Sequence, residues 1–151
     1  MARGASDLTS HLGYWLRHVS NHVSQGFARK LEKRDVTVAE WVILRELYGV
    51  GPVAPSRLAG KLGLTRGAVT KLADRLIAKS LLVRRASLAD GRAQTLALTA
   101  QGRLIVPALA ALADQNETEF FSHLSAAERS DMARILRDIV TRRGLRSAPA
   151  T

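Results

Sequence analysis

The chain has 151 residues, 46% of them hydrophobic, which is enough for one domain with a real core and too little for two independent cores. It contains no cysteine, which excludes disulfides, thiolate nucleophiles and cysteine-based peroxide sensing. No apolar run approaches the roughly 20 residues that span a bilayer, and the first ten residues lack the apolar stretch of a secretory signal, so we expect a cytoplasmic protein without a membrane partner.

The net charge of +10 is concentrated in the middle of the chain. Residues 57–103 contain ten basic and two acidic residues, whereas residues 104–143 contain six acidic and five basic ones. A block of one sign favours a surface that binds nucleic acid. A solvated surface without a partner is the alternative.

The first half of the chain is predicted to be helical. Apolar residues recur every three or four positions between Leu8 and Leu31, which predicts one long amphipathic helix. Thr37 and Glu40 have the spacing of a capping box and therefore predict the start of a second helix. The Gly and Pro content of residues 49–53 indicates a loop.

Two short helices are predicted next, joined by a tight turn. Pro55 suits the first turn of the earlier helix, which Gly63 ends, and Thr65 caps the later one. The apolar residues of the later helix form one stripe, and its opposite face is polar and basic, with Arg66, Thr70, Lys71 and Arg75.

After this helix the apolar period falls to two. Residues 81–87 and 94–99 are expected to be strands, and the Asp-Gly pair between them favours a β-hairpin. Thr99 then caps a fifth helix, and Ser125 with Glu128 forms the capping box of a sixth. We expect a single domain in which helices at 8–33 and 100–143 form a dimer, residues 37–99 bind DNA and residues 144–151 are a tail.

Helix, tight turn, helix and basic hairpin in this order predict a winged helix-turn-helix, a mainly α fold with a small β-hairpin wing. A helix fits the major groove of DNA, and a hairpin reaches the neighbouring minor groove. There the potential is most negative, which favours a permanently charged guanidinium such as that of Arg92 at the hairpin tip. Asp90 can orient Arg92 by a charge-assisted hydrogen bond. The alternative is that Asp90 only makes the turn and Arg92 is solvated.

The segment DGRAQTLALTAQG resembles the wing pattern Asp-x-Arg-x-x-x-Leu-x-Leu-Thr-x-x-Gly of the multiple antibiotic resistance regulator (MarR) family, through Asp90, Arg92, Leu96, Leu98, Thr99 and Gly102. Residues 58–85 are similar to that family's helix-turn-helix, although Ser80 stands where glycine is usual. The resemblance implies a homodimeric, ligand-responsive bacterial transcription regulator, acting as a repressor on double-stranded DNA at a pseudo-palindromic operator. The expected DNA contacts are Arg57, Thr65, Arg66, Ala68, Thr70, Lys71, Arg75, Arg84, Asp90 and Arg92.

Other functions are less consistent with the residues. The glycines at 49–51 and 60 lack the spacing of a phosphate-binding loop, and no serine has a recognisable base, so we expect neither an enzyme nor a bound cofactor. A nucleoid or RNA-binding protein that does not recognise sequence is the alternative, because it would use the same basic surface. The outer helices carry apolar residues expected to meet a two-fold partner, namely Leu8, Leu12, Leu136 and Ile139.

Three histidines, His11, His18 and His22, fall within one arc of the first predicted helix. His11 and His18 are roughly 10 Å apart along a helix axis, so one metal ion could join only His18 and His22 to ligands from elsewhere. The alternative, which we adopt in assigning no metal, is that they line a helix interface or an effector cleft. Aromatic walls and a fixed cation suit a small aromatic or anionic effector. The expected lining is Trp15, His18, His22, Trp41 and Arg45.

Overall fold

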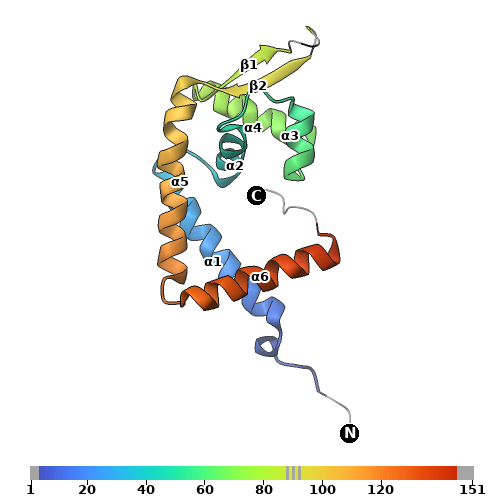
Figure 1. The fold of residues 1–151 in the computed structure, drawn as a ribbon, viewed down its shortest axis with the longest axis vertical. Coiled ribbons are helices and arrows are strands. Elements are labelled where there is room, and N and C mark those ends of the chain that lie inside the picture. Colours follow the sequence, from blue (N-terminus) through green and yellow to red (C-terminus); the bar gives the residue numbers. More distant parts are fainter. Residues whose placement is uncertain (1–3, 88, 90, 92, 146–151) are drawn as a thin grey trace.

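The computed structural model describes residues 4–87, 89, 91 and 93–145, and these form a mainly helical fold with one antiparallel hairpin (Figure 1). The predicted fold class is thus confirmed. In chain order the elements are η1 Leu8–Ser10, α1 Leu12–Glu32, α2 Val38–Leu47, α3 Pro55–Leu62, α4 Arg66–Ala78, β1 Leu82–Ala86, β2 Gln94–Leu98, α5 Ala100–Phe121 and α6 Ala126–Arg143.

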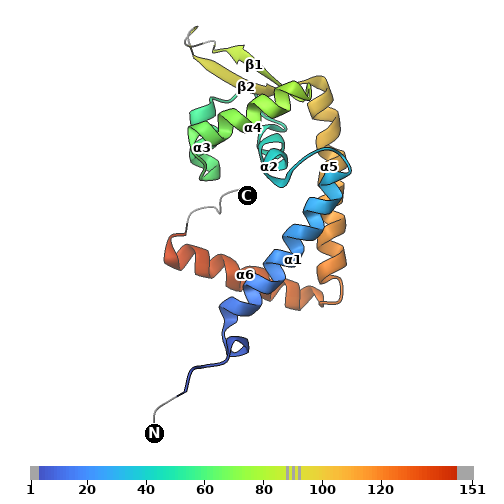
Figure 2. The same ribbon diagram turned by 180° about the vertical axis from the view of Figure 1, so that it is seen from behind.

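The elements gather at two ends of an elongated molecule. Helices α2, α3 and α4 pack together beneath the hairpin, while α1 and α6 cross at the other end (Figures 1 and 2). The long helix α5 runs from the base of the hairpin to the turn before α6, alongside α1. It therefore connects the two ends.

The buried core lies mostly at the end that holds the hairpin. Ile43 and Leu44 of α2 are fully buried, and Val69 and Leu76 of α4 pack into the same cluster. Leu96 of β2 is buried in the same cluster. In contrast, no residue of α6 is buried in the single chain.

The predicted caps are present. Thr37 and Glu40 form the capping box of α2, and Ser125 and Glu128 form that of α6. The Thr65 hydroxyl accepts a hydrogen bond from a backbone N–H in the first turn of α4. These bonds satisfy N–H groups that have no partner within the helix, so short polar signals are enough to position helix starts.

The end of α4 has the geometry usual for glycine although serine is present. Ser80 adopts a left-handed conformation with φ of 62°, and the Leu81 N–H donates to Leu76 O at 2.9 Å. This is the Schellman arrangement of a helix C-terminus. The departure at Ser80 therefore leaves the turn intact and puts a side chain into a sterically costly conformation.

The hairpin pairs with a third segment of the chain besides its own two strands. Leu82 pairs with Leu98 and Arg84 with Leu96, as expected for adjacent strands. Val53, in the segment predicted as a plain loop, also pairs with Leu96 through hydrogen bonds of 2.9 and 2.8 Å. This bridge corrects the loop prediction, and it ties the segment before α3 to the wing.

The predicted first helix is interrupted near its start, which corrects its N-terminal boundary. Residues 8–10 form a 3-10 turn closed by the Ser10 hydroxyl, which donates to Asp7 O at 2.7 Å. His11 is extended, with φ of −103°, and α1 begins at Leu12. A local side-chain hydrogen bond thus competes with the helix where periodicity alone predicts continuity. None of the described helices is long and apolar enough to cross a membrane.

Candidate nucleic-acid interface

Helix α4 has one face in the core and one face in solvent. Val69, Leu72 and Leu76 are buried. The opposite face exposes Arg66, Thr70, Lys71 and Arg75, as its periodicity predicts, whereas Ala68 is half-buried. The three cations on this face have no ion pair within the described part of the chain, so their charge is available to a ligand.

The turn before α4 holds that face in place. Gly63 ends α3 with φ of 67°, and Thr65, itself exposed, caps α4 two residues later. Arg57, exposed on α3, adds a further cation at this end of the molecule. A rigid turn of this kind fixes the angle at which α4 can enter a groove.

Besides the cap residue Thr65, two of the predicted contact residues already have side-chain partners inside the chain. The Thr70 hydroxyl donates to Arg66 O at 2.9 Å, so only its acceptor positions remain available. Arg84 forms an ion pair with Asp74 of α4. Its guanidinium therefore joins the hairpin to α4. A phosphate that contacts Arg84 would have to share this guanidinium with Asp74.

Arg85 is a further candidate contact that the predicted residues do not include, although strand alternation contains the signal. Arg84 lies on the side of β1 that faces α4, and its neighbour in a strand points to the opposite side. Arg85 is exposed and has no ion pair among the described residues. Asp90 and Arg92, the predicted contacts at the hairpin tip, lie outside the described residues.

Lys79, at the end of α4, connects this helix to α2 and to the segment before α2. Its ammonium donates to the buried Glu40 carboxylate at 2.9 Å and to Asp35 O at 2.6 Å. Burial alone raises the pKa of Glu40, but the hydrogen bonds from Lys79 and Thr37 together hold this pKa below its ordinary value of 4.5. Glu40 is thus a charged anchor between α2 and α4.

The residues predicted for an effector cleft are divided between separate places. His18 and His22 face a cavity of about 480 Å³ that is otherwise lined by Val19 of α1, by residues 120, 121, 123 and 124 and by Met132 of α6, with nothing from α2. Trp41 instead packs edge-on against Phe27 at 6.2 Å between ring centroids.

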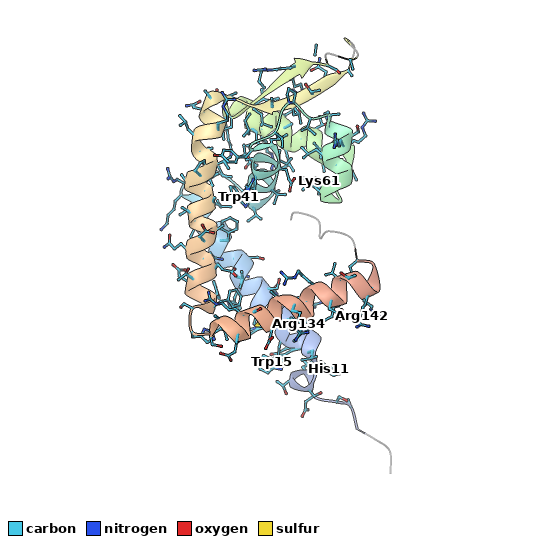
Figure 3. The ribbon with its side chains drawn as sticks, viewed as in Figure 1. His11, Trp15, Trp41, Lys61, Arg134 and Arg142 are labelled. Atoms are coloured by element: carbon cyan, nitrogen blue, oxygen red, sulfur yellow. The ribbon has the colours of Figure 1, made fainter. Side chains whose placement is uncertain are left out.

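The other two predicted lining residues also lie apart from that cavity. Arg45 lies over the Tyr48 ring at 5.7 Å, and the Trp15 indole donates to Thr9 O at 2.9 Å. Figure 3 shows Trp15 near the start of α1 well separated from Trp41, which belongs to α2. The five residues do not share one cavity in the single chain.

The cavity beside His18 and His22 has little capacity for a metal ion. Its third histidine, His123, follows α5. Within the described ranges, no group of three or more His, Cys, Asp or Glu side chains has a geometry that could hold a metal. The cavity is better suited to an aromatic molecule, because Phe120 and Phe121 form part of its wall.

Known proteins resemble this chain in sequence and in fold. Residues 34–93 match the model of the MarR family, and they include α2, α3, α4 and β1. The HTH-type transcriptional repressor MdtR of Bacillus subtilis is 30% identical over 100 residues, which cover 66% of this chain and 64% of the repressor. The match thus spans slightly less than two thirds of that relative.

Solved structures extend the similarity over most of the chain. BpsR of Bordetella bronchiseptica, whose DNA binding is regulated by 6-hydroxynicotinic acid, is 25% identical with a TM-score of 0.79, covering 90% of this chain and 97% of that one. MepR of S. aureus, solved as a complex with DNA, is 26% identical with a TM-score of 0.77, covering 87% and 97%. The winged helix, the wing pattern and these similarities agree, and the chain resembles the MarR family in sequence and in fold.

Proposed function

We propose that the protein is a transcription regulator that binds double-stranded DNA in a sequence-specific manner and represses a promoter. The observation that carries this proposal is the exposed face of α4, where Arg66, Lys71 and Arg75 stand without ion pairs on a helix fixed by the core. Such a helix can place short side chains against base edges while its cations contact phosphates. The solved complex of MepR with DNA supports the same use here.

The proposed active form is a homodimer. α6 buries no residue in the single chain, and it exposes Ile135, Leu136, Ile139 and Val140 by between 42% and 48%. Leu12 of α1 is 81% exposed at the same end of the molecule. An isologous contact through these faces would remove that apolar surface from water and set two α4 helices about one DNA turn apart, roughly 34 Å.

The proposed dimer responds to a small aromatic or anionic effector. BpsR, a relative of the same fold, is regulated by a planar aromatic carboxylic acid. The cavity beside His18 and His22 offers aromatic walls and imidazoles that can donate to a carboxylate. An effector that binds better to the DNA-free spacing of the two α4 helices would release DNA by linkage.

This function needs no catalytic group, and it places the protein in the cytoplasm, where the promoter is. The test begins by selecting DNA from a random pool with the full chain, followed by fluorescence anisotropy on the selected and a scrambled duplex. We expect at least a 1,000-fold preference for the selected site, which is the lower end for specific regulators.

Variants of the α4 face make this test specific. Lys71→Ala should weaken binding to the selected duplex by about tenfold, while Arg137→Gln on α6 removes the same charge far from the proposed interface and should change it less than twofold. Equal affinity for both duplexes would instead support a nucleoid or RNA-binding protein that ignores sequence. Equal losses in both variants would exclude α4 as the contact surface.

A further inference from the structure

A second cavity lies where the C-terminal end of α1 packs against α5, and its lining is strongly basic. Its volume is about 510 Å³. It is lined by Arg29, Lys30, Lys33 and Arg34 from α1 and the turn after it, and by Leu112 and Phe120 of α5. The only carboxylate in this lining is that of Glu119. Four cations thus surround one hollow with a single negative group.

The base of this cavity is firmly built. A Cβ placed on Gly26 would lie 2.8 Å from Asn116 Oδ1 and 3.0 Å from the Phe120 ring, so α1 and α5 approach as closely as glycine allows. Asn116 is buried and donates to Val23 O at 3.0 Å. The two helices are therefore held at a fixed distance beneath the cations.

The four cations differ in whether they already have partners within the chain. Lys30 is bound at the base, where its ammonium donates to Glu119 at 2.7 Å and to Asn116 Oδ1 at 3.0 Å. Arg29, Lys33 and Arg34 are exposed, and none has an ion pair or a side-chain hydrogen bond within the described part of the chain. These three charges are available to a ligand that enters the cavity.

A purely structural explanation accounts for only part of this arrangement. Cations in the last turn of a helix interact favourably with its dipole, which suits Arg29 and Lys30. Arg34 lies beyond the end of α1, and Lys33, the C-cap residue, follows Arg29 at a helical spacing where like charges repel. An anion bound between Arg29 and Lys33 would remove that repulsion.

We propose that this cavity binds a small organic phosphate, in which a flat apolar group carries a doubly charged phosphate. Arg29 and Arg34 can each donate two hydrogen bonds to phosphate oxygens, and Lys33 adds a point charge. Leu112 and Phe120 are half-buried and provide an apolar wall for the remainder of the molecule. This class of ligand differs from the monocarboxylate expected at the histidine cavity by its second charge.

The test measures binding of 1-naphthyl phosphate to the full-length protein by isothermal titration calorimetry. Inorganic phosphate and 1-naphthol represent its two parts, and 1-naphthoate has the same ring with one charge. We expect 1-naphthyl phosphate to bind at least tenfold more tightly than each of the three. Equal affinity for 1-naphthoate, or no binding at millimolar concentration, would overturn the proposal.

A pair of charge-matched variants locates the site. Arg29→Gln with Arg34→Gln should weaken binding of 1-naphthyl phosphate at least tenfold. The control is Arg137→Gln with Arg143→Gln on α6, which removes two exposed cations that also lack an ion pair among the described residues, and it should change the affinity less than twofold. An equal loss in the control would show general attraction to a basic protein. The titration contains no DNA, so its failure would leave the proposed function standing.

Discussion

Replacing Gly102 by alanine should destabilise the protein, although alanine normally favours a helix. Gly102 lies in the first turn of α5, where a Cβ would stand 2.3 Å from Leu81 O and 3.3 Å from Leu98 Cδ2. The closer atom belongs to the backbone and already accepts a hydrogen bond from the Thr99 N–H at 3.1 Å, so no side-chain rotation relieves the contact.

The size of this effect follows from two opposing contributions. Alanine in place of glycine gains up to about 1 kcal/mol in a helix. Forcing a methyl group into a closely packed site costs about 1–3 kcal/mol, and a rigid backbone partner puts Gly102 at the upper end. We therefore expect a net loss of about 1–2 kcal/mol, which corresponds to a decrease in Tm of roughly 2–8 °C for a chain of this length.

Gly67→Ala provides the matched control for this prediction. Gly67 also lies in the first turn of a helix, α4, but a Cβ there meets nothing within 4 Å. This substitution should leave stability unchanged or raise it by up to about 1 kcal/mol. Both variants are compared by urea denaturation at one fixed protein concentration, because dimerisation changes apparent stability. A Gly102→Ala protein as stable as Gly67→Ala would refute the close contact with Leu81.

Three further predictions concern single side chains. Ser80→Gly should raise the free energy of unfolding by about 0.5–1 kcal/mol by removing strain at φ of 62°, and an unchanged urea midpoint would contradict this. Glu40→Gln should lower the free energy of unfolding by about 1–2 kcal/mol at pH 7. Because the pKa of folded Glu40 lies below 4.5, this difference from wild type should be complete above about pH 5 and should shrink as the pH falls through the lowered pKa. A difference that stays constant with pH would exclude the charged pair. Arg92→Ala should weaken binding to the selected duplex by about 1–3 kcal/mol and reduce the salt slope by roughly one, and an unchanged slope would exclude a phosphate or minor-groove contact.

The features that the sequence predicts correctly are those fixed by short-range chemistry. The cap at Thr65 and the left-handed Gly63 depend on a few neighbouring residues, so their pattern is visible in the chain. The two faces of α4 follow from a repeat within a single helix. The predicted contacts omit Arg85, although the same kind of local signal, strand alternation, separates it from Arg84.

The features that the sequence predicts poorly depend on which faces meet. Periodicity shows that Trp15 and Trp41 lie on apolar faces, but it does not determine that Phe27 covers Trp41 while Trp15 turns back to Thr9. The bridge at Val53 likewise requires the hairpin to lie beside a segment more than 40 positions earlier. Such contacts depend on tertiary packing, which overrides local signals.

Under the proposed function, a movement of the dimer helices α1 and α5 can be transmitted to α4 through a few direct contacts. Lys79 joins the end of α4 to Asp35, in the segment between α1 and α2. Asn116 holds α1 against α5, and Gly102 brings α5 to within contact of Leu81, directly before the wing. A shift of α1 along α5 would therefore act on α4 from the α1–α2 segment and on the wing from α5. Both contacts involve backbone carbonyl oxygens, of Asp35 and Leu81. We therefore expect such a shift to move α4 and the wing together. A ligand that changes the spacing of two α4 helices requires this coupled movement.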